Sequence, residues 1–273
     1  MKNYFLFVVT VLAFSQNVSY ANDARIGGHV RVNFDHRDWI SSEDRSRFQL
    51  ESVKLTINGG NNEFEYKADY RWYENVEMDV VKYADFSYLP TDHHKFTLGI
   101  TQVPFGNLTY NSNSFWFSVN YYLGFEDDYD AGAVYQYKFE DLTLNLGYFF
   151  NDEYDNASNF SRYSFDVSDD GIHRNKENGQ WNARISKLFT LNKLGTFDVG
   201  LSLQSGEILN LNTHKNEAHH AYAAHFVHQK SNFKTMFQYT KYEYKPALPD
   251  STNAIAISAF NYPFLIAAEA KST

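Results

Sequence analysis

Charged side chains at every second position are the feature of this sequence that could do chemistry. The clearest set consists of Glu65, Lys67, Asp69 and Arg71, with Tyr or Ala between them. Because successive side chains of a β-strand point to opposite faces, these four charges share one face. A strand face of mixed charge is expensive against lipid, about 2–4 kcal/mol for a Lys or Arg at the bilayer midplane. This face is therefore predicted to line water and to act on solutes electrostatically, without catalysis.

A second segment divides its residues in the same way. Between residues 30 and 35, Val and Phe alternate with Arg, Asn and Asp. The residues predicted to line a pore are Arg31, Asp35, Lys67, Asp69 and Arg71. Charges farther than about 8 Å away are screened at physiological salt, so these local charges should dominate ion selectivity. Since neighbouring acids offset the bases, weak selectivity is expected.

Histidine is the other residue type with chemical possibilities here. The cluster consists of His214, His219, His220, His225 and His228. On a strand, His219 and His225 face opposite to His220 and His228, so these four side chains cannot converge on one metal ion. We predict no metal, no cofactor and no catalytic residue. An outer-membrane enzyme such as a lipid hydrolase stays open as an alternative, and it requires a Ser or Thr within about 3.2 Å of His220 or His228.

A long segment dense in aromatic rings follows the fifth predicted strand. Its rings include Phe115, Trp116, Phe117, Tyr121 and Tyr122. In water they would form an unusually large apolar patch. Two arrangements remain open: the segment packs down as a cap or extracellular girdle, which we favour, or it folds into the lumen and narrows it.

The elements that must position these residues are strands. Segments of about ten residues alternate apolar with polar side chains and end at Gly, Asn or Asp turns. Ten residues at about 3.3 Å each, tilted by about 40°, span roughly 25 Å, the height of the lipid-facing band of an outer-membrane barrel. Strands are predicted at Gly28–Asp35, Arg47–Asn58, Glu63–Tyr73, Val80–Leu89, Lys95–Val103, Tyr129–Phe139, Asp141–Asn151, Trp181–Leu191, Thr196–Ser205, His220–Gln229 and Phe233–Tyr244, with a poorly patterned twelfth between Ala254 and Ala270.

Connections between these strands alternate between short and long, as periplasmic turns and extracellular loops do. The long ones are expected at 105–128, 152–180 and 206–219. In the second strand the apolar phase changes between Leu50 and Val53, and a β-bulge near Glu51 and Ser52 would restore it. The predicted fold is all-β: an antiparallel transmembrane β-barrel, of which eleven or twelve strands are present.

The N-terminus and the composition agree with export. Residues 1–21 read as a cleaved signal peptide, with Lys2 before an apolar stretch and a small-x-small site at Ser19–Ala21. The barrel domain is then 22–273. With Cys 0 the chain has no disulfides, so backbone pairing must stabilise it, and aromatic content of 18% suits interfacial girdles. A net charge of −9 makes nucleic acid an unfavourable partner. A soluble β-sandwich that binds ligands stays open as a further alternative.

Several motifs resemble those of one family. Val103–Gly106, Phe115–Ser118 and Tyr121–Gly132, together with Gly28–Asp35 and Lys241–Tyr244, are similar to segments of porins of the phosphate-selective porin O and P type. The resemblance implies a sixteen-stranded and typically homotrimeric barrel in the outer membrane of a Gram-negative bacterium, in contact with lipid and lipopolysaccharide. It also implies passive diffusion of small solutes or ions.

The sequence departs from this family in two ways. Anion-selective members have a basic pore lining, whereas this chain has mixed charges on its predicted lumen face, so phosphate specificity is not carried over. The chain also ends at Glu269–Thr273 without a terminal aromatic residue. We therefore expect the N-terminal part of a larger barrel, with a free edge at its first strand, because an open sheet in lipid must be closed by further strands.

Overall fold

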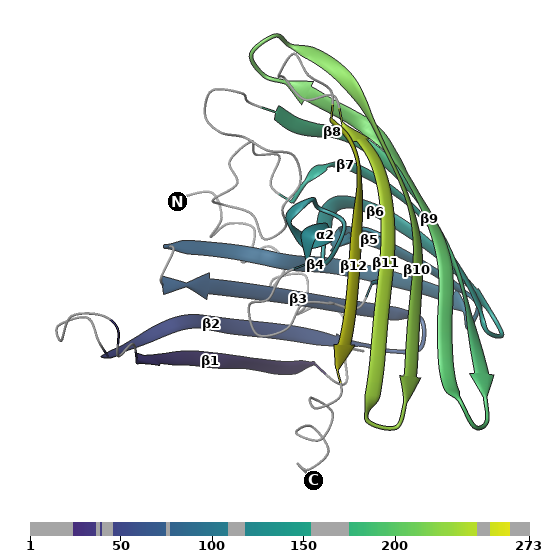
Figure 1. Ribbon diagram of the computed structural model, residues 1–273, viewed down its shortest axis with the longest axis horizontal. Helices are drawn as coiled ribbons and strands as arrows, with labels where there is room; N and C mark the ends of the chain where they lie inside the picture. Colours follow the sequence, from purple (N-terminus) through teal and green to yellow (C-terminus); the bar gives the residue numbers. More distant parts are fainter. Residues whose placement is uncertain are drawn as a thin grey trace.

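A computed structural model describes residues 24–36, 39, 46–74, 77–108, 118–153, 175–244 and 252–262. One antiparallel sheet of twelve strands, in sequence order, dominates it (Figure 1). The strands are β1 (Arg25–His36), β2 (Ser46–Gly60), β3 (Phe64–Tyr73), β4 (Met78–Thr91), β5 (His94–Gln102), β6 (Tyr129–Phe139), β7 (Leu142–Asp152), β8 (Asn175–Leu191), β9 (Gly195–Asn210), β10 (Lys215–Lys230), β11 (Phe233–Tyr244) and β12 (Thr252–Tyr262). The short helix α2 (Val119–Tyr122) lies between β5 and β6.

The predicted strands are confirmed, and the largest differences lie at the ends of β8, β9 and β10. β9 runs to Asn210 and β10 starts at Lys215, so the long connection expected at 206–219 is a four-residue turn. β8 likewise starts at Asn175, six residues before the expected Trp181. These extensions carry polar residues on both faces, so they lack the alternation that marks a lipid-facing strand. Polar residues on both faces are typical of strand ends that extend beyond the bilayer.

The predicted bulge in β2 is confirmed. Arg31 pairs with Ser52 and Val32 pairs with Leu50, so Glu51 is the extra residue. The bulge returns Phe48 and Leu50 to the face that carries the apolar residues of β1. Among the described residues, β1 pairs with β2 and no pairing joins β1 to β12, so the sheet is an open wall of an incomplete barrel.

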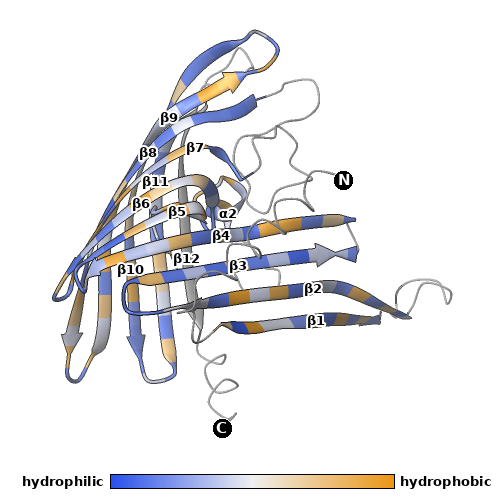
Figure 2. Cartoon of the chain, turned by 180° about the vertical axis from the view of Figure 1, so that it is seen from behind, coloured by the Kyte–Doolittle hydropathy of each residue, from blue (hydrophilic) through white to orange (hydrophobic). Residues whose placement is uncertain are grey.

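The two faces of this wall differ in chemistry. Apolar side chains on the outer face are exposed, for example Val30, Phe34, Leu98, Trp181 and Leu201. Figure 2 shows the resulting alternation of hydrophobic and hydrophilic residues along the strands. The described strands form one continuous sheet, unlike the two packed sheets of a sandwich. Across the same described ranges, no helix has the length and apolar character of a transmembrane helix.

Aromatic rings on the outer face gather near the short turns. On β3 and β4, Phe64 stacks on Phe86 with centroids 5.5 Å apart. On β9 and β10, Phe197 stacks on His228 at 4.5 Å. Phe96 and Tyr135 form a similar pair on β5 and β6, at 4.9 Å. Such a belt is typical of the membrane–water interface of an outer-membrane barrel.

Candidate functional site

The inner face of β1 to β5 is a wall of ion pairs. On β1, Arg31 Nη1 donates to Glu51 Oε1 at 2.8 Å, and Asn33 donates to the other oxygen of Glu51. Near the end of β1, Arg47 Nη2 lies 3.5 Å from Asp35 Oδ2. The bulge places Glu51 on this face, so the same backbone irregularity that corrects the lipid face also supplies a partner for Arg31.

Asp69 is the centre of the next group of charges, on β2 and β3. Lys54 Nζ lies 3.0 Å from one oxygen of Asp69, and Arg71 Nε donates to the other at 2.9 Å. Asp69 itself is almost fully buried. A carboxylate held by two cations stays ionised and leaves a net positive charge in its surroundings.

Lys67 pairs with a residue that the sequence analysis did not assign to it. Its Nζ lies 3.4 Å from Asp85 Oδ2 on the neighbouring β4. Glu65, which was expected to offset the bases of its own strand, pairs instead with Lys95 Nζ on β5 at 2.5 Å. Arg71 does pair within its own strand, with Asp69. Lys67 instead pairs with the residue directly opposite on β4, which lies closer than alternate residues of one strand, and Glu65 reaches across β4 to β5.

Two of the pairs on this wall, Arg31 with Glu51 and Lys67 with Asp85, share one orientation, whereas in the pair of Lys95 with Glu65 the acid is the more exposed partner. The Arg31 side chain is 47% exposed while Glu51 is 3% exposed, and Lys67 is 46% exposed while Asp85 is 2% exposed. In these two pairs, long basic side chains reach outward over carboxylates that lie against the sheet. The two neutral pairs therefore present their positive ends to solvent.

The β5–β6 loop (residues 103–128), as far as the structure describes it, lies on the inner side of the sheet. Figure 1 shows α2 within the concave side of the sheet, and α2 contacts β12. Residues 103–108 and 118–128 thus lie on the inner side of the sheet, and the choice between a cap and a constriction for the ring-rich segment stays a prediction. In α2, Tyr121 is buried and Tyr122 is exposed. Phe115, Trp116 and Phe117 lie outside the described residues.

The first limb of the loop is attached to β8, β9 and β11. Gly106 N donates to Ser202 Oγ at 3.0 Å, and Arg184 Nε donates to Gly106 O at 2.9 Å. Asn107 N donates to Gln238 Oε1 at 2.7 Å. These contacts connect residues up to 131 positions apart in sequence.

The second limb is attached to the opposite part of the wall, on β4. Lys82 Nζ donates to both oxygens of Asp127, at 2.8 and 2.7 Å, and it lies 4.8 Å from the centroid of the Tyr129 ring. Both charged side chains are buried. Asp127 has a φ of 57°, a left-handed conformation that Asp tolerates better than most residues. The loop therefore spans the interior between two separate parts of the sheet.

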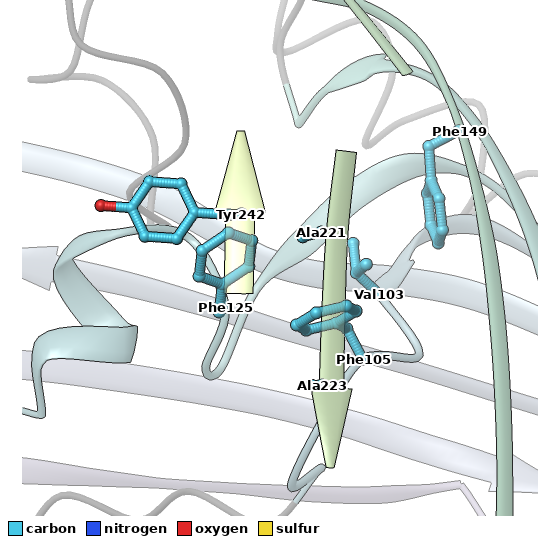
Figure 3. Packing of buried hydrophobic residues seen from close by; sticks show 7 residues of the cluster. All are labelled: Val103, Phe105, Phe125, Phe149, Ala221, Ala223 and Tyr242. Carbon is cyan, nitrogen blue, oxygen red and sulfur yellow. The ribbon is translucent and has the colours of Figure 1, made fainter. Parts of the chain in front are cut away.

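A small hydrophobic cluster fills the space between the loop and the sheet (Figure 3). Phe105 and Phe125 lie 5.2 Å apart between ring centroids, and Phe125 lies 5.4 Å from Tyr242 on β11. Ala221 and Ala223 on β10 belong to the same cluster. Their small side chains leave room for the rings of the loop.

Sequence reasoning missed the residues that hold the loop. Arg184 is on the predicted polar face of β8, between Asn182 and Ser186, so its inward direction could have been found from alternation. The inward direction of Lys82 could not have been found in this way, because Lys82 is the extra residue of a bulge in β4. Asp69 pairs with Tyr83 and Tyr70 pairs with Val81, which leaves Lys82 between them. A bulge of this kind leaves no clear mark in a segment such as Val80–Tyr83.

The histidines are divided between the faces as predicted. His219 and His225 are buried on the inner face, whereas His228 stacks on an outer-face ring. Among the described residues, no group of three or more His, Cys, Asp or Glu is arranged to hold a metal ion.

One pair meets the distance criterion set for an enzyme. Ser205 Oγ lies 3.1 Å from His220 Nδ1 on the exposed face. Ser205 pairs with Trp181 and His220, and His220 pairs in turn with Glu243, all within a regular antiparallel ladder. Acyl transfer also requires free N–H groups that stabilise an oxyanion, and a ladder of this kind commits its N–H groups to other strands. The pair is therefore a cross-strand hydrogen bond within the ladder.

No known family model and no curated protein matches the chain. Among solved structures, it is similar to the outer membrane channel DcaP of Acinetobacter baumannii, with 12% identity over 81% of this chain and 64% of that chain, at a TM-score of 0.51. It is also similar to a loop L8 deletion mutant of OmpT, an outer membrane protein of Vibrio cholerae, with 11% identity over 89% of both chains and a TM-score of 0.46. A BenF-like porin from Pseudomonas fluorescens Pf-5 matches at 10% identity over 88% of this chain and 70% of that chain, with a TM-score of 0.38. The likeness to DcaP shows the fold of an outer-membrane channel, and the chain spans slightly less than two thirds of the length of DcaP.

Proposed function

We propose that this protein is an outer-membrane porin through which small hydrophilic solutes or ions diffuse passively. The observation that carries the proposal is the β5–β6 loop, which spans the interior beside a wall of water-facing ion pairs. A loop inside a wide barrel narrows it, and charges beside the opening select among solutes. The outer face, apolar and bordered by aromatic rings, suits lipid.

Recording in a planar lipid bilayer tests this function. Protein folded and inserted into the bilayer should give discrete conductance steps. Protein that is shown by protease protection to be inserted, but that gives no steps, would contradict the proposal.

The pore-lining residues remain Arg31, Asp35, Lys67, Asp69 and Arg71. The sequence predicts weak selectivity, and the orientation of two ion pairs gives it a direction, a modest preference for anions, because Arg31 and Lys67 are wet while their partner carboxylates are buried. Lys67→Glu should shift the reversal potential under a salt gradient toward cations. Lys193→Glu, the same charge change in the turn between β8 and β9, should leave it unchanged, since a distant charge is screened. Equal shifts in the two variants, or a strong preference for phosphate over chloride, would contradict this assignment.

The family, the oligomeric state, the contacts with lipid and the route of export are also proposals. The motif at Val103–Gly106, which resembles phosphate-selective porin O and P proteins, lies in the first limb of the inward loop, and this position supports membership of that family without supporting phosphate specificity. The resemblance further supports a homotrimer, contact with outer-membrane lipid and lipopolysaccharide, and export by a signal peptide at residues 1–21. Those residues lie outside the part of the chain that the structure describes.

A further inference from the structure

We propose that three side chains on the far wall, Arg184, Ser202 and Gln238, are positioning residues that set the width of the pore by fixing the first limb of the β5–β6 loop. We call them the anchor cluster. They belong to β8, β9 and β11, and together they hold the backbone of Gly106 and Asn107. The inference rests on the proposed porin function, because width matters only where solutes pass.

The anchor cluster binds the loop through its backbone. Gly106 N and O and Asn107 N are all hydrogen-bonded, to a hydroxyl, a guanidinium and a side-chain amide. Backbone contacts leave loop side chains free to vary while the path of the chain stays fixed. They also satisfy polar groups that would otherwise be buried at a cost of about 1–3 kcal/mol each.

Gln238 has the largest share of these contacts. Its Oε1 accepts from Asn107 N, while its Nε2 donates to Thr240 Oγ1 at 3.1 Å and to Phe125 O at 3.4 Å. One side chain therefore joins both limbs of the loop to β11. Its relative accessibility of 0% means that neither limb can move away without exposing it.

Gly106 makes this close approach possible. A Cβ atom at this position would lie 2.2 Å from Gln238 Oε1, and the φ of Gly106 is 56°. The backbone of the loop therefore lies directly on the Gln238 amide, and the two residues are matched in shape.

The guanidinium of Arg184 is held in place by residues of the sheet. Its Nη2 lies 2.8 Å from His225 Nε2 and 3.6 Å from Asp198 Oδ2, and its Nη1 donates to Ser186 Oγ at 3.0 Å. A guanidinium with this many fixed partners offers its remaining Nε–H in one direction only. That direction is toward Gly106 O.

The test compares two glutamines on the same inner face in the full chain. Gln238→Ala removes the anchor, whereas Gln204→Ala removes a buried glutamine whose hydrogen bonds go to Gln180 and Asn182 on β8. Each lost hydrogen bond should reduce the ratio of docked to released loop by roughly fivefold. We expect the Gln238→Ala channel to conduct more per opening than wild type, and the Gln204→Ala channel to conduct as wild type does.

A second readout reports loop position without depending on conduction. Because the chain has Cys 0, an Ala223→Cys reporter has no background, and Ala223 is 5% exposed in the cluster that contains Phe105. A water-soluble thiol reagent should modify this cysteine slowly in the Ala223→Cys variant and equally slowly when Gln204→Ala is added. When Gln238→Ala is added instead, the modification should be at least about fivefold faster.

The two readouts separate the possible failures. Inserted wild type without conductance would overturn the porin function, and the modification rate of the reporter cysteine at position 223 would still test the anchor. Equal modification rates with Gln238→Ala and with Gln204→Ala would contradict the role proposed for the anchor cluster. Equal conductance of both variants and wild type would also contradict it. Replacing Gln238 by Glu, which retains the acceptor for Asn107 N, should restore part of the wild-type protection.

Discussion

At the scale of single residues, Gly106 combines two constraints that can be separated by experiment. Gly106→Ala introduces a left-handed alanine, which costs about 1–2 kcal/mol, and a contact with Gln238 that costs about 1–3 kcal/mol more. Gly179 also has a positive φ, 83°, but the nearest atom to an added Cβ is Tyr148 Oη at 3.3 Å. In urea unfolding from vesicles, Gly106→Ala should therefore lose at least about 1 kcal/mol more stability than Gly179→Ala. Equal losses would show that the close approach to Gln238 is not a constraint.

The buried pair of Lys82 and Asp127 leads to a second prediction at this scale. Lys82→Met leaves the Asp127 carboxylate buried without its cation, so the free energy of unfolding should fall by about 3–5 kcal/mol. Combining Lys82→Met with Asp127→Asn removes the unpaired charge, and Asn accepts the left-handed φ at this position. The double variant should recover most of the loss. A double-mutant cycle with no coupling would contradict the role given to this pair.

At the scale of elements, the bulge in β2 decides which residues meet lipid. Deleting Glu51 would move Phe48 and Leu50 to the inner face, because a shift of one residue exchanges the faces of a strand. We expect the deletion variant to fail to fold into vesicles, as measured by protease protection. Glu51→Ala keeps the extra residue and loses only the side-chain contacts with Arg31 and Asn33, so it should fold. Normal folding of the deletion variant would contradict the assigned register.

The strands and their faces could be predicted because each face has one consistent environment. Both ends of two strands were predicted as the structure has them, those of Tyr129–Phe139 and Phe233–Tyr244. The bulge at Glu51 was predicted from the change in the apolar alternation of that strand. β8 begins with residues that are polar on both faces, and β9 ends with Ile208 and Leu209 on opposite faces. Alternation is therefore lost at both strand ends, and these ends could not be predicted. The inward direction of the loop could not be predicted either. It depends on contacts such as Asn107 with Gln238, which lie 131 positions apart.

At the scale of the whole molecule, the curved sheet has one side for lipid and one for water, and the distribution of charge follows from this division. The formal net charge of −9 describes the whole chain, yet the wet ends of the ion pairs at Arg31 and Lys67 are positive. Taken alone, a net charge of −9 would favour cations. The orientation of long bases over short acids is a property of the packed wall, so the sequence could not reveal it.

The central claim is that one face of this wall meets an aqueous lumen and the other meets lipid. It is tested most directly by comparing how readily thiol reagents reach adjacent positions of one strand. The absence of native cysteine, Cys 0, allows single cysteines at Lys67 and Ala68 on β3 and at Thr97 and Leu98 on β5. In sealed vesicles, a charged water-soluble thiol reagent should modify the inner-face positions 67 and 97 and spare their neighbours 68 and 98, because the side-chain direction of a strand alternates at every residue. A thiol reagent dissolved in the lipid should show the reverse order. If both members of each pair react equally with the water-soluble reagent in inserted protein, the account is wrong.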